Sequence, residues 1–440
     1  MTGAAAAGDT RHHVVIVGCG FGGLFAAKAL KRENVRVTII DRTNHHLFQP
    51  LLYQVATGIL SEGQIAPAIR DVMRRYESIN VVLGEVEHID IAAKEVHVDE
   101  FGMALTVGYD SLIVAGGATT SYFGHDEFRQ AASGMKSLDD ALALRGEIFG
   151  AFEVAEAEAD ETKRRRQMTF VVVGGGPTGV EISGQLRELS RRALRRNYRR
   201  IKPEDTRVVL VEGTDHLLGS MGARVSRLTA RKLTRMGVEL HLGATVSGMD
   251  DEGVEITKPD GSKERIPAAT RIWAAGTRAS GLGEVLAREA GAELDKAGRV
   301  RVARDCSVPG HPEVFAVGDL MALDDLPGLA EVAMQSGAHA AHAIVRRLEG
   351  KEPKDFHYRD LGTLAVISRF TAVAQIGPVQ VGGFIGWLLW LVVHVTFLTG
   401  FKNRFGALAR WGVSFVGHGR YERALTGRWV ARAERPGGSA

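Results

Sequence analysis

The chain has 440 residues, more than one compact core usually holds, so its length predicts two or three domains. Hydrophobic residues make up 45% and charged residues 24%, which excludes a chain that is disordered throughout. A formal net charge of +3 is small for this length and excludes a strong overall field for nucleic acid.

The cysteines and the first ten residues bear on the compartment. Only Cys19 and Cys306 occur, without Cys-x-x-Cys spacing, so neither a disulfide framework nor a metal site is expected. Residues 1–10 are rich in Ala and Gly and have neither the basic start nor the apolar run of a secretory signal. We therefore expect a loose tail on a protein of a reducing, cytosolic compartment.

The first chemical motif is a glycine turn between a predicted strand, residues 13–17, and a predicted helix, residues 24–30. The turn reads Gly18-Cys19-Gly20-Phe21-Gly22-Gly23 and fits the GxGxxG pattern of dinucleotide-binding proteins. Gly18 permits the tight turn, Gly20 lets the backbone approach a pyrophosphate, and Gly23 lets the helix pack on the strand.

A carboxylate follows this turn at the expected place. The next predicted strand, residues 35–40, ends in Asp41, where an acidic side chain would hold ribose hydroxyls. The strand, turn, helix and acid together predict a dinucleotide site, and a glycine-rich turn without a ligand is the alternative.

The same pattern occurs a second time. Residues 169–173 predict a strand, followed by Gly174-Gly175-Gly176-Pro177-Thr178-Gly179 and a helix that begins near residue 180. After a long Arg-rich helix, a strand over residues 207–211 ends in Glu212, although farther from the turn than usual. Because a carboxylate accepts ribose hydroxyls and repels a 2′-phosphate, NADH is favoured over NADPH.

Two further strands end in small residues, Tyr109–Gly117 with Ala115 and Thr270–Gly276. Small side chains at a strand end allow a cofactor to come close, and for the second strand a crossing between domains is an equal alternative. Residues 313–319 form another apolar run, which ends in Gly318 and Asp319.

Together these elements resemble the pyridine nucleotide-disulfide reductase superfamily over roughly residues 12–370. The resemblance implies an α/β fold with two Rossmann-like domains, one for FAD and one for NADH. The implied FAD residues are Gly18, Gly20, Phe21, Gly22, Gly23, Asp41, Ala115, Gly318 and Asp319. The implied NADH residues are Gly174, Gly176, Gly179, Glu181, Glu212 and Gly276, with Glu181 near the nicotinamide.

The missing cysteine pair narrows the choice within that superfamily. Disulfide reductases, thioredoxin reductases and sulfide:quinone oxidoreductases use cysteines, and here Cys19 lies in the phosphate turn, where a structural role is expected. We therefore expect electrons to leave the flavin directly for a diffusible acceptor.

Residues 44–56 and 330–335 are similar to segments of type II NADH:quinone oxidoreductases. This resemblance implies that the second segment lines a quinone site, where Gln335 matches a family glutamine and Glu331 replaces another. A carboxylate in that place accepts hydrogen bonds and donates none unless it is protonated. The implied quinone residues are Pro50, Tyr53, Gln54, Glu331 and Gln335, and the implied catalytic residues are Glu181, Gln335 and Glu331.

An apolar stretch, residues 381–401, contains one His and no formal charge, and is just long enough to span a bilayer. His394, two threonines and four glycines argue against spanning. In residues 402–420 the aromatic residues Phe405, Trp411 and Phe415 alternate with Lys402, Arg404, Arg410 and Arg420. We expect a monotopic helical anchor on the cytoplasmic face of the cell membrane, with a spanning helix or a dimer interface as alternatives.

Seven arginines lie between Arg187 and Arg200, and a second basic run, Lys163 to Arg166, precedes them. Such a run is usually a solvated helix face, and only Tyr198 adds an aromatic ring to it, so nucleic acid is not an expected partner. Attraction to anionic lipid or to NADH stays open.

The sequence thus predicts an FAD-dependent, non-pumping NADH:quinone oxidoreductase, and a homodimer is expected. The rivals are a reductase of a soluble acceptor such as ferredoxin or oxygen, and a signalling flavoprotein that responds to NADH. The predicted FAD domain has two parts, residues 11–125 and 298–375. The predicted NADH domain is inserted between them as residues 126–297, and a membrane-associated helical region follows as residues 376–440.

Overall fold

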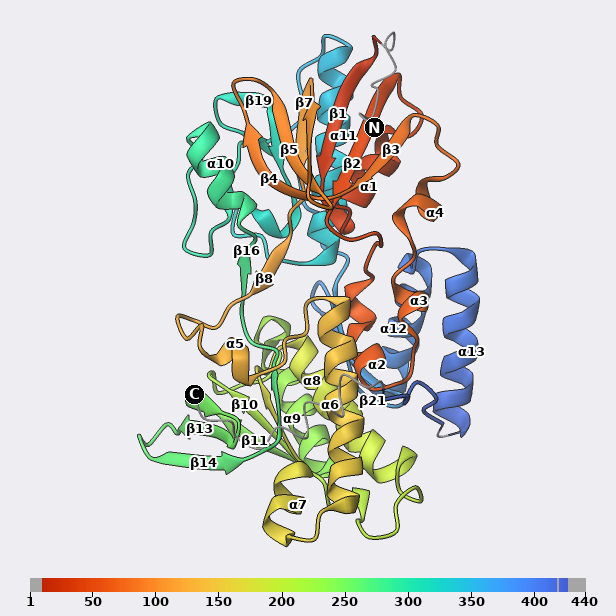
Figure 1. Ribbon diagram of the computed structural model, residues 1–440, viewed down its shortest axis with the longest axis vertical. Coiled ribbons are helices and arrows are strands. Elements are labelled where there is room, and N and C mark those ends of the chain that lie inside the picture. Colours follow the sequence, from red (N-terminus) through yellow and green to blue (C-terminus); the bar gives the residue numbers. More distant parts are fainter. Residues whose placement is uncertain (1–9, 418, 426–440) are drawn as a thin grey trace. The chain divides into compact units, whose positions relative to one another are not determined.

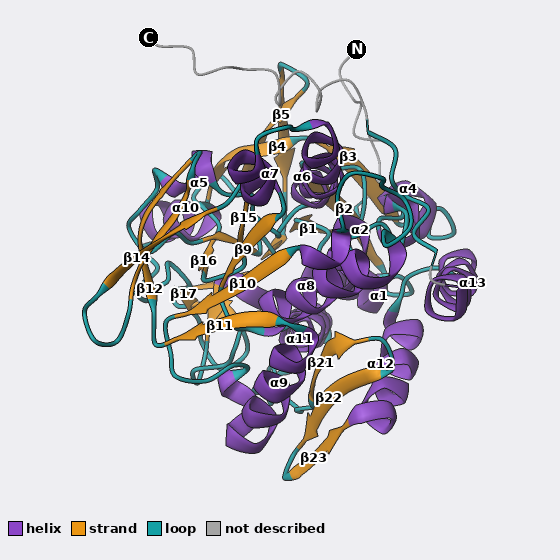
Figure 2. Ribbon diagram, turned by 90° about the horizontal axis from the view of Figure 1, so that it is seen from below, coloured by secondary structure: helices purple, strands orange, loops and turns teal. Residues whose placement is uncertain are grey.

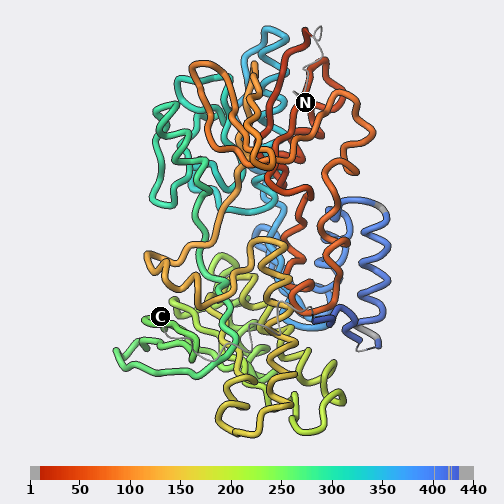
Figure 3. Tube along the Cα trace, in the orientation of Figure 1, coloured from red at the N-terminus to blue at the C-terminus, as the bar shows by residue number. Residues whose placement is uncertain are grey.

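The computed structural model describes residues 10–417 and 419–425. The chain divides into two compact units, each built from several stretches of sequence (Figure 3). Unit 1 contains residues 1–47, 67–119 and 277–360, and unit 2 contains residues 48–66, 120–276 and 361–440. Residues 1–9, most of the expected N-terminal tail, lie outside the described part of the chain.

Unit 1 is built on a six-stranded sheet in the order β18-β19-β7-β1-β2-β3 (Figure 1). Strand β1 lies at its centre because its side chains, from Val14 to Val17, are apolar and buried. It runs parallel to β2 and β7, and β3 and β19 extend the parallel arrangement outward. The carboxyl ends of these strands therefore meet at one edge, where open α/β sheets bind ligands.

A second, antiparallel sheet of unit 1 contains β4, β5 and β6. The elements of unit 1 are β1 (His12–Val17), α1 (Phe21–Leu30), β2 (Val35–Asp41), α4 (Ile69–Met73), β3 (Ile79–Leu83), β4 (Glu85–Asp90), β5 (Glu95–Glu100), β6 (Met103–Gly108), β7 (Ser111–Val114), β16 (Thr277–Ala279), α10 (Leu282–Ala290), β17 (Val300–Arg301), β18 (Ser307–Val308), β19 (His311–Ala316), η5 (Gly318–Leu320), β20 (Met321–Ala322) and α11 (Ala330–Leu348). Strand β8 (Ala118–Thr120) lies where the chain leaves this unit.

Unit 2 repeats the strand, turn and helix arrangement. Its parallel sheet has the order β11-β10-β9-β15, with β9 buried throughout, and a three-stranded antiparallel sheet, β12-β13-β14, follows it. The α/β class with two Rossmann-like halves is confirmed.

The first elements of unit 2 are η1 (Gln49–Leu51), α2 (Leu52–Ala56), α3 (Glu62–Ile65), α5 (Phe128–Ala131), α6 (Leu138–Ala157), α7 (Glu161–Gln167), β9 (Thr169–Val173), α8 (Pro177–Glu188), the π-helical turn η2 (Leu189–Ala193), η3 (Pro203–Asp205) and β10 (Arg207–Glu212). Then come η4 (Gly219–Met221), α9 (Gly222–Met236), β11 (Val238–Leu242), β12 (Thr245–Asp250), β13 (Gly253–Thr257), β14 (Lys263–Pro267) and β15 (Thr270–Trp273). The last are β21 (Thr363–Ser368), β22 (Thr371–Ile376), β23 (Val379–Gly382), α12 (Gly383–Phe397) and α13 (Phe401–Gly417).

The apolar stretch of residues 381–401 is not one element. Its first residues complete β23, the helix α12 begins only at Gly383, and the chain bends after Phe397 before α13 starts. Figure 2 shows α12 alongside β22, and the close approach of Gly386 to the carbonyl oxygen of Ala372 explains that packing. The 15 residues of α12 rise about 22 Å, less than the roughly 30 Å of a bilayer core.

The division into units differs from the predicted domains at several places, and unit 2 also includes residues 120–125 and the predicted C-terminal helical region. Residues 277–297 join unit 1, because Ala279, Leu286 and Ala292 enter its hydrophobic core. Residues 361–375 join unit 2, because Gly184 on α8 lies against the backbone of Ile367, so closely that a Cβ there would be 1.8 Å from its carbonyl oxygen. Residues 48–66 also belong to unit 2. The assignment of all these segments depends on side-chain packing, which the strand patterns of the sequence do not reveal.

The Arg-rich helix is shorter than expected. It ends after the π-helical turn at Ala193, and residues 194–202 contain only turns, bends and irregular backbone. Its first arginine, Arg187, is buried instead of solvated, and its guanidinium donates hydrogen bonds to the carbonyl oxygens of Met236 and Thr206.

Candidate functional site

The first glycine turn lies at the carboxyl edge of the unit 1 sheet. Gly18 has φ +92°, and a Cβ there would be 2.5 Å from the carbonyl oxygen of Ala115. A Cβ on Gly23 would lie 1.8 Å from the carbonyl oxygen of Gly18, so only glycine lets α1 begin here. A Cβ on Gly20, by contrast, would meet nothing within 4 Å, which leaves the backbone open to a phosphate.

Asp41 is tied to this turn. Its Oδ2 accepts a hydrogen bond from the amide of Cys19 at 2.6 Å, and its Oδ1 accepts from the amide and the hydroxyl of Thr43 at 2.7 and 2.8 Å. A carboxylate has about four acceptor positions, so Asp41 keeps capacity for ribose hydroxyls while its orientation is held.

His46 is a feature of this edge that the sequence reasoning did not identify. It is fully buried, and its Nδ1 lies 2.9 Å from the carbonyl oxygen of Cys19, which accepts only, so Nδ1 carries the proton. Burial lowers the pKa of His46 to about 4, and its Nε2 has no hydrogen-bond partner among the described residues. This buried acceptor beside the open face of Gly20 fits a nucleotide cofactor that brings its own donor. The position of His46 five residues after Asp41 was the feature of the sequence that could have indicated a role at this site.

The remaining predicted FAD residues gather at the same edge. Ala115 follows β7, and a Cβ on Gly22 of α1 would lie 3.5 Å from the Cβ of Ala115. Gly318, at φ +68°, donates its amide to Ser336 at 3.0 Å, and Asp319 follows it in η5 after β19. Phe21 packs edge-on against His46 with ring centroids 5.3 Å apart. The structure therefore brings the predicted set together in unit 1.

Unit 2 builds its glycine turn in the same way. Gly174 has φ +109° and leaves 2.8 Å between a built Cβ and the backbone of Ala274. A Cβ on Gly179 would lie 1.8 Å from the carbonyl oxygen of Gly174, while one on Gly176 would meet nothing within 4 Å. The geometry that opens the first turn towards a phosphate is thus repeated.

The acid of this second turn repeats the contacts of Asp41. Glu212 Oε2 accepts from the amide of Gly175 at 2.5 Å, and its Oε1 accepts from the amide and the hydroxyl of Thr214, both at 2.8 Å. The unusually long spacing to Glu212 therefore does not displace its carboxylate from the turn.

Gly276 stands three residues after β15, at φ +69°. A Cβ there would be 2.4 Å from the ring of Phe123, a residue that is itself in the left-handed region at φ +54° and 68% exposed. This exposed ring beside the strand end was not identified from the sequence.

Glu181 lies on the first turns of α8 and is buried. Its Oε1 accepts a hydrogen bond from the amide of Val366 at 3.2 Å, and burial raises the pKa of Glu181 to about 8. A carboxyl group with such a pKa keeps its proton at neutral pH and can release it to a neighbour.

Two predicted quinone residues join a buried polar cluster in the same unit. Trp411 on α13 donates to Gln54 at 2.6 Å, and Gln54 donates to the hydroxyl of Tyr53 at 3.1 Å. Burial and the nearby Glu181 raise the pKa of Tyr53 well above its usual value. The structure thus brings Glu181 close to the neighbouring residues Tyr53 and Gln54, which lie far from it in sequence. Pro50 lies just before this pair, in η1.

Arg420 completes this cluster. Arg420 and Trp411 belong to the stretch expected to form the membrane anchor, but they are 7% and 2% exposed, and Arg420 donates to Gln185 at 2.7 Å. For these two residues the expectation of a lipid-facing position was wrong. Burial lowers the pKa of Arg420 to about 10, and the guanidinium acts on the Tyr53 hydroxyl electrostatically. The side chain of Phe415, from the same predicted stretch, lies outside the described part of the structure.

The other two predicted quinone residues lie on the first turns of α11, in unit 1. Gln335 donates its amide to the carbonyl oxygen of Arg359 at 2.9 Å and accepts the amide of the same residue at 3.0 Å. Glu331 accepts from the hydroxyl of Tyr358 at 3.3 Å. Both side chains therefore bind the segment that follows α11.

His394, the one histidine of the apolar stretch, lies in α12. It is buried, its Nδ1 lies 2.8 Å from the carbonyl oxygen of Trp390, and burial lowers its pKa to about 4. It is therefore neutral at physiological pH. Cys19 and Cys306 are buried and burial raises the pKa of both thiols, as expected of structural cysteines.

Comparison with known proteins gives concordant matches. The pyridine nucleotide-disulphide oxidoreductase family matches residues 12–337. The type II NADH:quinone oxidoreductase NdhA of Mycobacterium tuberculosis is 49% identical over 425 residues, 96% of this chain and 90% of the relative. The type II NADH:quinone oxidoreductase Ndh of the same organism is 48% identical over 419 residues, 94% of this chain and 90% of the relative.

A solved structure agrees with this fold. The structure of NDH2 from Plasmodium falciparum in complex with RYL-552 has a TM-score of 0.86 at 20% identity, and the match covers 93% of this chain and 99% of that one.

Proposed function

Because this chain belongs to the type II NADH:quinone oxidoreductases of the pyridine nucleotide-disulphide oxidoreductase family, we propose which of its residues serve each part of that activity. The enzyme transfers electrons from NADH to a quinone with FAD as cofactor. Bound FAD would supply the two-electron chemistry, accepting hydride equivalents and passing electrons on.

The FAD residues are those at the carboxyl edge of the unit 1 sheet. The open backbone at Gly20 would receive the pyrophosphate of FAD, and Asp41 would accept the ribose hydroxyls. Asp319 would hold the ribityl-phosphate part of the cofactor. His46 Nε2 accepts one further hydrogen bond. The observation that supports this assignment is the glycine cradle with its anchored carboxylate.

The NADH residues are those of the repeated cradle in unit 2. Gly176 leaves room for the pyrophosphate, and Glu212 accepts the ribose hydroxyls. A fixed carboxylate repels a 2′-phosphate, so the enzyme prefers NADH to NADPH.

The proton-handling residues belong to the buried cluster of unit 2. Glu181 holds a proton at neutral pH, and Tyr53 and Gln54 provide hydrogen-bonding groups beside it. We assign Glu181 as the proton source for quinone reduction because it combines burial with a pKa close to the working pH. Glu331 and Gln335 stay predictions for quinone contact, since their described partners are Tyr358 and Arg359.

The surface that attaches the enzyme to a membrane is formed by α12 and α13. Large apolar side chains on α12 are strongly exposed, led by Ile385 at 64% and Phe384 at 59%, and Phe405 on α13 is 70% exposed. An apolar surface of this kind needs lipid or protein to cover it, and exposed Lys402 and Arg404 favour an anionic surface. The apolar surface supports peripheral attachment, which we place on the cytoplasmic side.

Within the described residues, no helix has both the length and the apolar character needed to cross a bilayer. The enzyme transfers electrons from NADH to quinone without pumping protons, as type II NADH:quinone oxidoreductases do. A homodimer stays a prediction, and sedimentation velocity on the purified protein tests it.

The decisive experiment measures NADH oxidation by the purified FAD-loaded enzyme with a short-chain quinone, and vesicle binding in parallel. Truncation before α12 is unsuitable, because Trp411 and Trp390 are buried parts of unit 2. The double variant Phe384→Ser and Leu388→Ser instead removes exposed apolar surface, and Leu228→Ser on α9 is its control.

We expect quinone-dependent turnover in every variant and loss of vesicle binding only in the double variant. Flavin that NADH reduces but quinone does not reoxidise would instead support a soluble acceptor or a signalling role. Unchanged vesicle binding by the double variant would rule out α12 as the attachment surface.

A further inference from the structure

A cavity of about 500 Å³ lies in unit 2, lined by the end of α8 with its π-helical turn, by α9 and by the hairpin between β21 and β22. The nucleotide turn stands at the other end of α8, and the 12 residues of that helix separate the two by roughly 18 Å. This cavity is therefore distinct from the NADH cradle.

The lining of the cavity is strongly basic. Five cationic side chains and one carboxylate, that of Glu188, line it. The cations are Arg187, Arg191 and Arg192 from α8 and its π-helical turn, Lys232 from α9 and Arg369 from the hairpin. The dipole of α8 favours cations at its carboxyl end, but it does not explain the cations that α9 and the hairpin contribute.

Protein carboxylates neutralise only part of this charge, because Glu239 acts on Arg187 and Glu188 acts on Arg369. The buried Arg187 binds two neutral carbonyl oxygens, and Glu188 accepts the backbone amide of Arg369 at 2.6 Å. Within residues 10–417 and 419–425, neither Arg191 nor Arg192 nor Lys232 has a hydrogen bond or an acidic partner.

The cations also act on one another. Burial lowers the pKa of Arg187 to about 10, and Arg191 adds to that effect by repulsion. Burial and Arg192 likewise lower the pKa of Arg369. A cavity that gathers repelling cations is stabilised by a bound anion, and a phosphate group offers the oxygen acceptors that guanidinium groups prefer.

An aromatic wall connects the cavity to α12. Phe370 lines it from the tight hairpin turn, at φ +55°, and its ring lies 4.9 Å from Trp387 and 6.2 Å from Phe384, centroid to centroid. Phe384 begins the exposed apolar face of α12, with Ile385 and Leu388. The basic cavity and the apolar face of α12 are thus connected through Phe370. A phospholipid has the complementary arrangement, with a charged headgroup joined to apolar acyl chains.

We propose that this cavity binds the phosphate of an anionic phospholipid, whose acyl chains lie along the exposed face of α12. The proposal rests on the proposed membrane attachment and adds a specific lipid site to it. A free phosphate shares the headgroup chemistry, so the test separates the two sources.

The test compares the full-length, FAD-loaded enzyme with the triple variant Arg191→Gln, Arg192→Gln, Lys232→Gln. The matched control is Arg196→Gln, Arg231→Gln, Arg235→Gln, which removes the same charge from exposed positions outside the cavity. Binding to vesicles of phosphatidylcholine, with and without phosphatidylglycerol, is measured at constant ionic strength. Calorimetric titration with pyrophosphate supplies the arm without lipid.

We expect the enzyme and the control to prefer phosphatidylglycerol vesicles by about ten-fold or more, and the triple variant to lose that preference. Binding to pure phosphatidylcholine and NADH oxidation with a soluble quinone should persist in the triple variant. Equal loss in the control would overturn the site in favour of diffuse charge attraction.

One further outcome is that only the triple variant loses pyrophosphate binding, while the unmodified enzyme shows no preference for anionic lipid. That result would overturn the lipid as the occupant and retain a phosphate site. If the enzyme binds no vesicles at all, the membrane attachment itself fails, while the pyrophosphate arm still tests the cavity. Absence of both lipid preference and pyrophosphate binding would overturn the proposal.

Discussion

Glu212 accepts a hydrogen bond from the backbone amide of Gly175, with 2.5 Å between Oε2 and N. In unit 1, Asp41 accepts one from the amide of Cys19 at 2.6 Å, and each acid also binds a threonine two residues later. The two nucleotide cradles therefore hold their carboxylates in the same way. Each carboxylate is oriented before a ribose arrives, which lowers the entropy lost on binding.

The first prediction concerns the choice between NADH and NADPH. Replacing Glu212 with Gln removes the charge that repels a 2′-phosphate, so the ratio of kcat/KM for NADH to that for NADPH should fall about ten-fold or more. Steady-state kinetics with both nucleotides measures this ratio. The control Glu239→Gln, on the neighbouring strand β11, removes equal charge and should leave the ratio unchanged. An unaltered ratio in Glu212→Gln would show that another group selects the nucleotide.

The second prediction concerns retention of FAD. Asp41→Ala removes the acceptor of the Cys19 amide and the group assigned to the ribose, so we expect FAD affinity to fall about ten-fold or more. The ratio of flavin to protein absorbance after gel filtration reports it, and Asp41→Asn should be intermediate. Glu87→Ala, at an exposed position of β4, should retain FAD like the unmodified enzyme. Full retention by Asp41→Ala would contradict the assignment of the first cradle.

The third prediction is a pH dependence of stability. Burial raises the pKa of Glu181 to about 8, whereas in the unfolded chain this carboxyl group ionises near its ordinary pKa of 4.5, so between these pH values the folded state binds the additional proton. The contribution of this group to the free energy of unfolding therefore decreases as pH rises through that window. Denaturant titrations measure the free energy of unfolding of the enzyme and of Glu181→Gln across this pH window. As pH rises through it, the unmodified enzyme should lose a few kcal/mol of stability relative to the variant. Parallel pH profiles would mean that Glu181 is ionised in the folded state.

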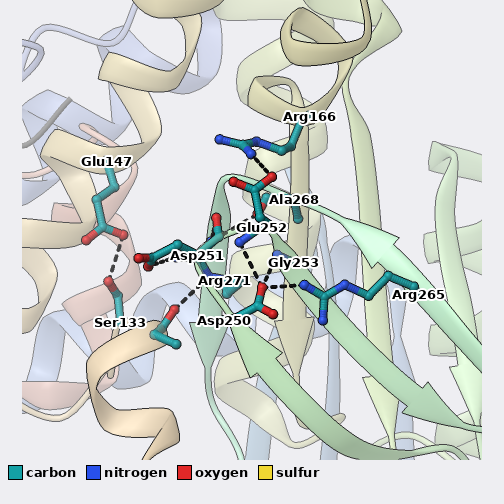
Figure 4. Close-up of polar contacts among 11 residues, drawn as sticks. Ser133, Glu147, Arg166, Asp250, Asp251, Glu252, Gly253, Arg265, Ala268 and Arg271 are labelled. Atoms are coloured by element: carbon teal, nitrogen blue, oxygen red, sulfur yellow. Dashed lines mark hydrogen bonds and ion pairs between the residues drawn. The ribbon is translucent and has the colours of Figure 1, made fainter. Parts of the chain in front are cut away.

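The fourth prediction concerns Arg271, which Figure 4 shows among backbone and acidic groups of unit 2. Its guanidinium donates to the carbonyl oxygens of Ala131, Asp251 and Ala268 at 2.6, 2.9 and 3.0 Å. These bonds join β15 to the antiparallel sheet and to α5.

Because Arg271→Met removes a guanidinium that is 11% exposed, together with its three hydrogen bonds, it should lower the free energy of unfolding by about 3–5 kcal/mol. Arg265→Met removes a more exposed cation, paired with Asp250, and should cost less than about 1 kcal/mol. Urea titration measures both changes, and similar losses in the two variants would argue against a special role for Arg271.

Residues that act through local chain geometry could be predicted from the sequence. Gly18 and Gly23 are required by a turn of six residues, and the strands around them are read from short apolar runs. Residues that act through packing could not. His46 is buried and neutral because of the residues that surround it in the fold. In the sequence, Arg187 cannot be distinguished from the solvated arginines near it, and only the packing of α9 against it shows that it is buried.

The amino-acid sequence alone determined the α/β class, both nucleotide cradles and the family, because glycine spacing and strand patterns are local properties with direct conformational consequences. Only the tertiary structure decided that Tyr53, Gln54, Glu181 and Trp411 share one buried cluster, and that basic residues from three elements line one cavity. Burial and electrostatic neighbours depend on which distant segments pack together. A single sequence does not specify that packing through its local patterns.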